Sequence, residues 1–397
     1  MRVLIRSTFK AATSDGRLAA YATGRRTMIS LLAAMLFGAH PAGAVAQEIA
    51  SPPHPLTSRQ PPDGKNSLEI KNQGYEFSFS AMGTQVELKA FHTDQALVQQ
   101  AFTQVQQRVA ELTAILTDYD PASETRRLST RARTDFVAVS DPLWRMLVAS
   151  DRWQQLSQGA FDSSLGQLTQ LWRKYRRTPR QPSPDELHWA RQHSGWQHVR
   201  LDSQRQRVRF DCDDLRLDFG AIGKGFVVDQ AFKIFEQHGL GCALVNISGN
   251  MRAGDPPPGR SGWRIEIAPL VHGGPPLRRM EVARISLATS GDLWQFMLID
   301  GIRRSHILDP RTGLGVVGPV CATVISPQAS DADALATTTC ILGFEGGQQI
   351  ARTLKNTELL WAKKISSDPT YWPDQSAPLP TSGLVHIQHT PGFPAAL

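Results

Sequence analysis

Short apolar segments that end at tight turns are the feature that most limits what this chain can fold into. Ala243–Ile247 is an apolar run that leads into a turn, and Trp263–Ile267 alternates apolar with charged residues, as a half-buried strand does. Asp300-Gly301 is typical of two-residue hairpin turns. Strand pairs are also expected within 75–90, broken at Met82-Gly83-Thr84, and within 199–210. Because such hairpins outnumber strand–helix–strand crossovers, we expect an α+β fold with mainly antiparallel sheets flanked by helices.

Several longer segments have the periodicity of helices that would flank these sheets. Residues 96–116 place an apolar stripe on one helix face, formed by Val98, Phe102, Val105 and Val109. A second helix is expected over 143–156. A third, with apolar residues spread over 227–235, should end at Gly239, a residue that suits the position just past a helix.

The first 46 residues have the features of an export signal rather than of a folded segment. Arg25-Arg26 precedes a short apolar run, Met28–Phe37, and Ala44-Val45-Ala46 resembles a cleavage site. The apolar run is too short to span a bilayer core of about 30 Å. The paired arginines leave both the twin-arginine route and an ordinary secretory route open. We expect cleavage before Gln47 and a periplasmic protein, and no cysteine follows the site to carry a lipid anchor.

The rest of the chain divides by composition. Residues 47–70 form a lead-in rich in proline, serine and glutamine that we expect to be flexible, 71–365 a large folded domain, and 366–397 a tail rich in proline and serine that has room for one last strand over 383–387. The signal holds six basic residues and one acidic residue, so +5 of the chain's +7 leaves with it. The mature protein is therefore near +2, and no nucleic-acid partner is expected. The basic run Arg173–Arg177 is interpreted as a solvated face.

The four cysteines do not have the spacing of a metal site. Cys212, Cys242, Cys321 and Cys340 form no Cys-x-x-Cys pair, which disfavours zinc. Cys242 and Cys340 lie in apolar surroundings and are expected to pack in the interior. No nucleophilic role is indicated.

A carboxylate and a hydroxyl share one face of a predicted helix near the C-terminal end of the domain. Ser330 is expected to cap this helix, which would run over 331–342 and end at Gly343. Asp333 and Thr337 are four residues apart on it and therefore adjoin. Two hard oxygens of this kind suit Mg²⁺, which takes its other ligands from water and phosphate. The alternative is that the acidic residues only favour the helix dipole.

A glycine-rich loop at 217–225 is the second polar cluster. Its glycines let a ligand approach the backbone, and Lys224 lies where a helix is expected to begin, so the loop could bind an anion. The spacing fits neither a P-loop nor a dinucleotide fingerprint. Lys224 could equally be a surface residue. Asp218, at the end of a strand, must find a donor or a cation.

Three further clusters each have two interpretations. His306, within the run Ser305–Gly313, could accept a proton from an attacking hydroxyl, or it could be structural. Ala288–Gly291 could approach a phosphate or a flat ring, or it could begin a helix. Asn246–Asn250 could line a ligand, or it could be an ordinary left-handed turn.

Taken in order, these clusters resemble the ApbE family, the FAD:protein FMN transferases. The resemblance covers about residues 75–365 and rests on seven motifs: Ala81–Thr84, Gly159–Asp162, Leu217–Gly225, Asn246–Gly254, Ala288–Gly291, His306–Gly313 and Ala332–Thr337. The chain departs from the family where Ser248-Gly249-Asn250 replaces two glycines and an acid, and it lacks the expected asparagine after Leu128. The longer C-terminal tail is a further departure.

The resemblance implies a Mg²⁺-dependent enzyme that splits FAD at its pyrophosphate, joins FMN to a Ser or Thr of a target protein and releases AMP. It implies Asp333, Thr337 and the Ala221 carbonyl as Mg²⁺ ligands and His306 as the base. It also implies a set of FAD-lining residues: Met82, Tyr119, Ala160, Phe161, Asp162, Asp218, Lys224 and Ile307. An exported transferase would serve an exported or membrane-anchored redox protein. Hydrolysis of FAD to FMN and AMP, or FAD binding without catalysis, are the alternatives.

Overall fold

The computed structural model describes residues 68–71, 74–133, 135–176, 180–364 and 385–397, all within one compact unit, Thr57–Leu397. The predicted export signal and its cleavage site lie outside the described residues, as do most of the lead-in and much of the tail. Within the described part, no helix is long and apolar enough to cross a membrane.

Most helices lie in the first half of the chain and most strands in the second. The helices are α1 (Gln95–Leu116), α2 (Glu124–Arg131), α3 (Asp141–Leu156), α4 (Gly166–Tyr175), α5 (Pro184–Gln192), α6 (Gly223–Gln237) and α7 (Ala329–Ala351), with a 3₁₀ turn at Trp196–His198. The strands are β1 (Leu68–Lys71), β2 (Gly74–Ala81), β3 (Thr84–Ala90), β4 (Val137–Ala138), β5 (Val199–Asp202), β6 (Arg207–Phe210), β7 (Ala243–Ile247), β8 (Asn250–Ala253), β9 (Trp263–Ile267), β10 (Arg278–Val282), β11 (Ile285–Gly291), β12 (Phe296–Ile299), β13 (Ile302–Asp309), β14 (Leu314–Val317), β15 (Val320–Ser326), β16 (Glu358–Lys364) and β17 (Val385–His389).

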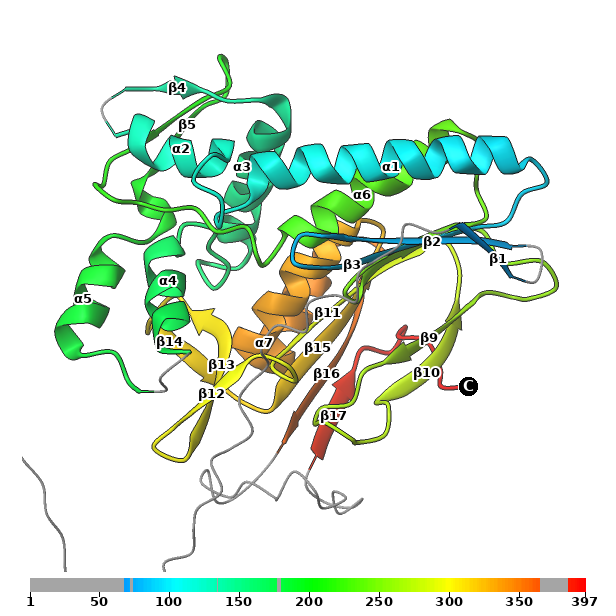
Figure 1. Ribbon diagram of the computed structural model, residues 1–397. Helices are drawn as coiled ribbons and strands as arrows, with labels where there is room; N and C mark the ends of the chain where they lie inside the picture. Colours follow the sequence, from blue (N-terminus) through cyan, green and yellow to red (C-terminus); the bar gives the residue numbers. More distant parts are fainter. Residues whose placement is uncertain (1–67, 72–73, 134, 177–179, 365–384) are drawn as a thin grey trace, which may run out of the picture. The chain divides into compact units, whose positions relative to one another are not determined.

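A nine-stranded sheet is the frame of the molecule (Figure 1). Its order is β1-β2-β3-β7-β8-β11-β15-β16-β17, and each neighbouring pair in it is antiparallel. Smaller sheets pair β9 with β10, β12 and β14 with β13, and β4 and β5 with β6, again antiparallel. The predicted α+β class with mainly antiparallel sheets is therefore confirmed.

Two-residue turns join three of the strand pairs where the sequence predicted a turn. Met82-Gly83 joins β2 to β3, Ser248-Gly249 joins β7 to β8, and Asp300-Gly301 joins β12 to β13. Both residues of each turn have a positive φ, from 51° at Asp300 to 86° at Gly249. This is the type I′ geometry, whose twist matches that of the strands. The Asn246–Asn250 segment is thus an ordinary left-handed hairpin turn.

Helices α1, α6 and α7 pack with the nine-stranded sheet in one large core. The predicted stripe of α1, from Val98 to Val109, is fully buried there. Helix α6 ends as predicted, because Gly239 takes a φ of 70° and its N–H and that of Leu240 bond back to the last turn. Those two bonds form a Schellman motif.

The start and the end of α7 differ from the prediction. Ser330 is not its cap. The helix begins at Ala329, and the Asp229 carboxylate of α6 accepts from the Ala329 and Ser330 amides at 2.8 and 2.9 Å. Gly343 breaks the helix with a φ of 78°, but the chain then resumes the helix to Ala351. The reason is that Phe344 and Ile350 beyond the break are buried in the large core.

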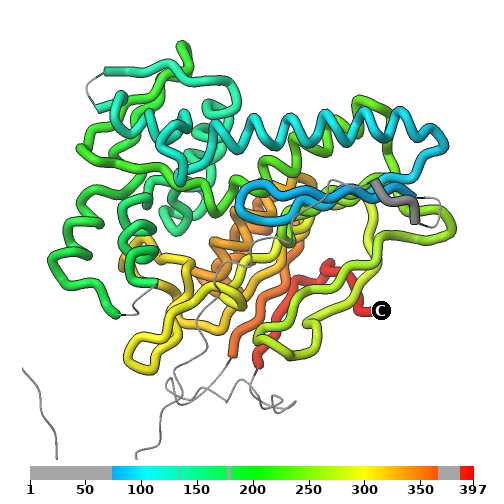
Figure 2. The backbone as a smooth tube through the Cα atoms, in the orientation of Figure 1, coloured from blue at the N-terminus to red at the C-terminus, as the bar shows by residue number. Residues whose placement is uncertain are grey.

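A second, smaller packing unit forms where α4 and α5 meet the β12–β14 sheet. Figure 2 shows these yellow strands beside the green helices. Its core contains Leu168 and Trp172 from α4 and Met297 and Leu308 from the strands. The Trp172 indole N–H donates to the Gly313 carbonyl at 2.8 Å. These contacts hold the last turn of α4 beside β13, the strand that carries His306.

The two edge strands of the large sheet come from segments that the sequence assigned to the ends of the domain. β1 begins at Leu68, before the predicted boundary at residue 70, and pairs with β2. β17 lies in the predicted tail and pairs with β16, close to the last strand expected over 383–387.

Candidate active site

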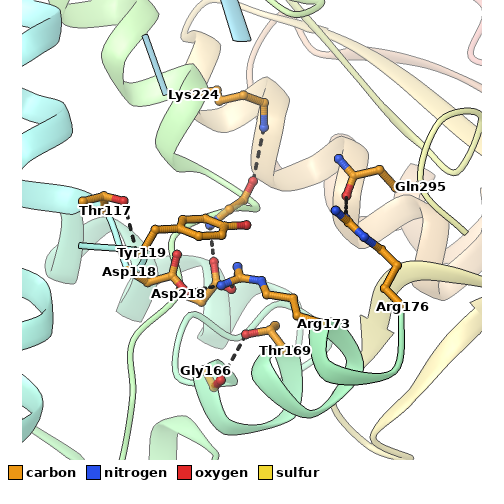
Figure 3. Close-up of polar contacts among 11 residues, drawn as sticks. Thr117, Asp118, Tyr119, Gly166, Thr169, Arg173, Arg176, Asp218, Lys224 and Gln295 are labelled. Atoms are coloured by element: carbon orange, nitrogen blue, oxygen red, sulfur yellow. Dashed lines mark hydrogen bonds and ion pairs between the residues drawn. The ribbon is translucent and has the colours of Figure 1, made fainter. Parts of the chain in front are cut away.

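The loop before α6 holds its shape through the Asp218 carboxylate. This carboxylate accepts from the Gly220 amide at 2.8 Å and from the Arg173 guanidinium of α4 at 2.8 Å. The sequence predicted that Asp218 would have a hydrogen-bond donor or a cation as its partner, and the structure provides both, in Gly220 and Arg173. Lys224, in the first turn of α6, donates to the Gly220 carbonyl at 3.2 Å, which folds its side chain back over the loop (Figure 3).

Asp333 is the carboxylate that ties α7 to this loop. Its side chain is 2% exposed and accepts from the Gly225 amide at 3.0 Å, while the Lys224 ammonium lies 3.9 Å away. Burial raises the pKa of Asp333, and the charge of Lys224 lowers it. Gly225 permits this approach, because a Cβ atom there would lie 2.2 Å from the Ala329 carbonyl oxygen.

Thr337, one turn along α7, faces the large sheet. Its hydroxyl lies 2.8 Å from the Ser290 hydroxyl of β11. Ser290 belongs to the Ala288–Gly291 motif, which is a strand, so the interpretation of that motif as the start of a helix is wrong. Ala221 is partly exposed in the loop before α6.

The oxygens of this group fit Mg²⁺ as a partial set of ligands. The described residues include no group of three His, Cys, Asp or Glu side chains that could hold a metal. Magnesium, however, commonly uses one or two protein carboxylates and completes its shell with water and phosphate. The buried Asp333 carboxylate, the Thr337 hydroxyl and the Ala221 carbonyl are hard oxygens of that kind. Mg²⁺ dependence itself stays a prediction.

His306 lies on β13 and has a fixed tautomer. Its backbone N–H donates to the Gln295 carbonyl at 3.1 Å, and its Nδ1 lies 3.0 Å from the same oxygen. A carbonyl oxygen only accepts, so Nδ1 must carry the proton. In the neutral ring, Nε2 is then left with a lone pair that can accept a proton from a substrate.

The surroundings of His306 keep the imidazole neutral. Although the residue reaches solvent, dense protein around it desolvates the ring, and this is the main reason that its pKa is lowered from 6.5. The positive charges of Lys224 and Arg176 act in the same direction, against the Gln295 carbonyl and the Asp292 carboxylate. A neutral imidazole with a free Nε2 is the form that a general base requires.

A buried ion pair fixes the segment that carries Gln295. The Asp292 carboxylate, fully buried, accepts from the Arg303 guanidinium of β13 at 2.7 Å and from the Val320 amide at 3.0 Å. Both charges are therefore satisfied inside the protein, as buried charges must be. The chain leaves this anchor and places Gln295 against His306.

Tyr119 is an exposed ring that lies against a cation. The residue is 75% exposed, and the Arg173 guanidinium carbon lies 4.2 Å from the ring centroid. Arg173 also pairs with Asp118 and Asp218 (Figure 3). Burial and the neighbouring Asp218 raise the pKa of Asp118, and Arg173 opposes them.

The interpretation of the basic run Arg173–Arg177 as a solvated face is wrong for Arg173. That residue is part-buried and bridges two carboxylates, whereas Lys174 next to it is exposed. The cause is the neighbouring Trp172, which turns inward to the small core and fixes the rotation of α4. Arg176 is exposed but donates to the Gln295 side-chain oxygen at 3.1 Å. Sequence reasoning missed Arg173, Arg176 and Gln295.

Several residues predicted to line FAD have side chains that are directed into the protein. Ala160 and Phe161 are buried, and Phe161 packs on Trp153. The Asp162 carboxylate accepts from the Ser164 and Trp196 amides at 2.7 and 3.0 Å, which stabilises the surrounding loops.

Ile307 and Met82 also pack against protein. Ile307 lies in a small apolar cluster with Val320, Ala322 and Cys340. Met82 is half-buried against the large core at the β2–β3 turn. The structure therefore brings together Tyr119, Asp218, Lys224, His306, Asp333 and Thr337. The side chains of the other predicted FAD residues pack or form hydrogen bonds within the protein. The prediction that these residues line FAD therefore requires contacts from their backbone atoms.

The cysteines take no part in this group. All four are free thiols, and Cys321 and Cys340 are buried. Burial raises the pKa of Cys242 to about 11 and that of Cys321 to about 12, so neither is ionised at neutral pH. Cys340 packs in the interior and Cys242 packs against a core, as predicted.

Known proteins match this chain in both sequence and fold. Residues 82–361 match the model of the ApbE family. A protein of Treponema pallidum named FAD:protein FMN transferase is 30% identical over 281 residues, covering 67% of this chain and 76% of its own length. The flavin transferase ApbE from Vibrio cholerae has a similar structure, with a TM-score of 0.68 and 24% identity over 82% of this chain and 99% of its own. The ApbE protein of Thermotoga maritima superposes with a TM-score of 0.66 and 26% identity over 73% of this chain and 94% of its own.

Proposed function

The chain belongs to the ApbE family, and we propose that it transfers FMN from FAD to a hydroxyl of an acceptor protein. The observation that carries this proposal is His306, whose ring the Gln295 carbonyl orients and whose pKa is lowered by burial and by the nearby charges of Lys224 and Arg176. The acceptor oxygen forms a bond to the phosphorus on the flavin side of FAD. The bond from that phosphorus to the bridging oxygen breaks, and AMP leaves with this oxygen. The product is a phosphoester between FMN and the acceptor.

His306 removes the proton from the acceptor hydroxyl in this scheme. Its Nε2 is free to accept because Nδ1–H is held by the Gln295 carbonyl. The low pKa of the ring keeps Nε2 unprotonated at neutral pH. Transfer of this kind depends on positioning and charge neutralisation more than on a covalent enzyme intermediate, which agrees with the un-ionised thiols.

Asp333, Thr337 and the Ala221 carbonyl would hold Mg²⁺ in this proposal. When bound, Mg²⁺ supplies charge neutralisation at the phosphates of FAD. Lys224 adds a second positive charge at the start of α6, where backbone N–H groups also favour an anion. Asp218 and Arg173 keep the loop before α6 in place.

We propose further that the protein acts in the periplasm, on an exported or membrane-anchored redox protein. The support is the sequence of the first 46 residues alone, with its paired arginines and its small-residue cleavage site. Cell fractionation with N-terminal sequencing of the recovered protein tests this part. We expect a periplasmic protein that begins at Gln47, and an intact presequence on a cytoplasmic protein would overturn it.

The reaction is tested with purified protein, FAD, Mg²⁺ and a candidate acceptor domain, followed by intact mass spectrometry of the acceptor. We expect a gain of one FMN less one water, lost when the acceptor Ser or Thr is replaced by Ala. AMP release with no change in acceptor mass would instead indicate FAD hydrolysis. FAD binding without AMP release would indicate a binding protein.

A further inference from the structure

Arg173, in the last turn of α4, and Arg176, the residue that caps the end of this helix, have different electrostatic surroundings although they are one turn apart. Arg173 and Arg176 are three residues apart, so their side chains leave the same face of the helix. Arg173 is neutralised by the carboxylates of Asp118 and Asp218. Arg176 donates to the neutral amide of Gln295, and the ion pairs found among the described residues include none with Arg176. One guanidinium is therefore paired, while the other is oriented without a counter-charge.

The oriented guanidinium lies beside the candidate base. Arg176 bonds to the side-chain oxygen of Gln295, and the backbone oxygen of the same residue holds the His306 ring. Figure 3 shows Arg176 and Gln295 on one side of the group, with Lys224 and Tyr119 on the other. The charge of Arg176 reaches both His306 and Tyr119. Burial lowers the pKa of His306 and Arg176 adds to that effect, whereas burial raises the pKa of Tyr119 and Arg176 opposes it.

This arrangement has the chemistry of a phosphate contact. A guanidinium presents several N–H donors in a fixed plane and pairs with phosphate through two bonds. Gln295 uses one of the five donors and supplies no negative charge, so the remaining donors stay available to an anion. A cation fixed by a neutral partner does not have to break an ion pair before it binds a ligand.

We propose that Arg176 binds the pyrophosphate of FAD from the α4 side, opposite the predicted metal ligands on α7. The proposal rests on the proposed function, because it takes FAD as the substrate. Arg176 contacts a non-bridging phosphate oxygen in the ground state. The other cation of the group, Lys224, approaches from α6. Arg176 is then a substrate-binding residue, whereas Arg173 holds Asp218 and Tyr119.

The test compares Arg176→Gln with Lys174→Gln in the full-length protein. Both variants lose one positive charge from the same helix, but Lys174 pairs with Glu186 on α5. Dissociation constants for FAD and for riboflavin, which has no phosphate, are measured by flavin fluorescence without an acceptor. We expect Arg176→Gln to weaken FAD binding by about tenfold to a hundredfold, as for the loss of hydrogen bonds to a charged group. Riboflavin binding should not change, and Arg176→Lys should restore part of the loss.

Each outcome bears on the proposal. Equal FAD binding by the two Gln variants would overturn it, as would an equal loss of FAD and riboflavin by Arg176→Gln. Circular dichroism and melting temperature of each variant separate loss of the fold from loss of the contact. Failure of the proposed function would give a different result from failure of the Arg176 contact. The wild-type protein would bind FAD in an Arg176-dependent manner but would modify no acceptor.

Discussion

The two regions that meet at the candidate site hold their polar groups in different ways. The large sheet with α6 and α7 presents Asp333 as a buried carboxylate, tied to the Gly225 amide. The small sheet β12–β14 with α4 presents His306 and Arg176 at the surface, both bonded to Gln295. Burial fixes an anion in the first region, and neutral hydrogen-bonding groups fix a base and a cation in the second. We infer that the first region binds a cation and that the second conducts the proton transfer and contacts the phosphate.

The largest effect is expected from the buried carboxylate. Asp333→Ala should abolish transfer, because it removes the one carboxylate of the predicted Mg²⁺ site. The loss of metal stabilisation is worth several kcal/mol, or about a thousandfold or more in rate. Transfer assays are combined with Mg²⁺ titration of the protein followed by melting temperature, which should rise with Mg²⁺ only in the wild type. Full activity of this variant, or full activity of the wild type in EDTA, would show that the large-sheet region does not bind a metal that the reaction needs.

His306 should give the next largest effect, and it should act on rate rather than on binding. His306→Ala should still bind FAD but transfer about a hundredfold to ten-thousandfold more slowly, the usual range for a general base. An unchanged rate at saturating FAD would show that His306 is structural. His272→Ala, on another exposed histidine, is the matched control.

The pH profile of the wild type sharpens this assignment. A base must be deprotonated, so activity rises as the pH increases through the pKa of His306. Burial, Lys224 and Arg176 lower this pKa, while the Gln295 carbonyl and Asp292 oppose them. The rise should therefore lie below pH 6.5 and disappear in His306→Ala. A rise above 6.5 would mean that another group is the base or that the ring is not desolvated.

A smaller effect is expected at the exposed ring between the two regions. Tyr119→Ala should weaken FAD binding about threefold to tenfold, since an aromatic stacking contact contributes about 0.5–1.5 kcal/mol. Tyr119→Phe keeps the ring and should bind FAD as the wild type does. Isothermal titration with FAD measures both variants. If Tyr119→Phe loses as much affinity for FAD as Tyr119→Ala does, the hydroxyl rather than the ring contacts the ligand.

The smallest effect concerns the cap that joins α6 to α7. Asp229→Ala should lower the stability by about 1 kcal/mol, as for other helix caps, and the melting temperature by about 2–4 °C. Asp94→Ala removes the side-chain cap of α1 and serves as the control. Both should melt earlier, but only Asp229→Ala should also slow transfer, because α7 carries Asp333. Equal transfer rates in the two variants would show that the Asp229 cap does not help to position Asp333.

Local patterns predicted several elements of the large-sheet region. The stripe on α1 and the turn dipeptides Met82-Gly83 and Ser248-Gly249 are determined by neighbouring residues, and each appears as expected. The Asp333–Thr337 spacing likewise places both side chains on one helix. The start of α7 could not be predicted this way, because its cap comes from Asp229, a hundred residues earlier in the chain.

The small-sheet region was harder to predict because its contacts join distant segments. The basic run in α4 has the composition of a solvated face. Only the burial of Trp172 and the fixed Gln295 segment bring Arg173 and Arg176 to the site. Asp162 shows the same dependence on distant segments. Its motif suggested a ligand contact, which stays a prediction, and no sequence pattern indicated that the Trp196 amide, 34 residues later, donates to its carboxylate.

The most direct test of the proposed transfer is the ratio of AMP released to flavinylated acceptor formed, measured in one reaction for the wild type and for His306→Ala. We expect one AMP for each FMN on the acceptor, with both products falling together in the variant. AMP in large excess at every acceptor concentration, with no acceptor modified, would contradict it and would show that the site uses water in place of a protein hydroxyl.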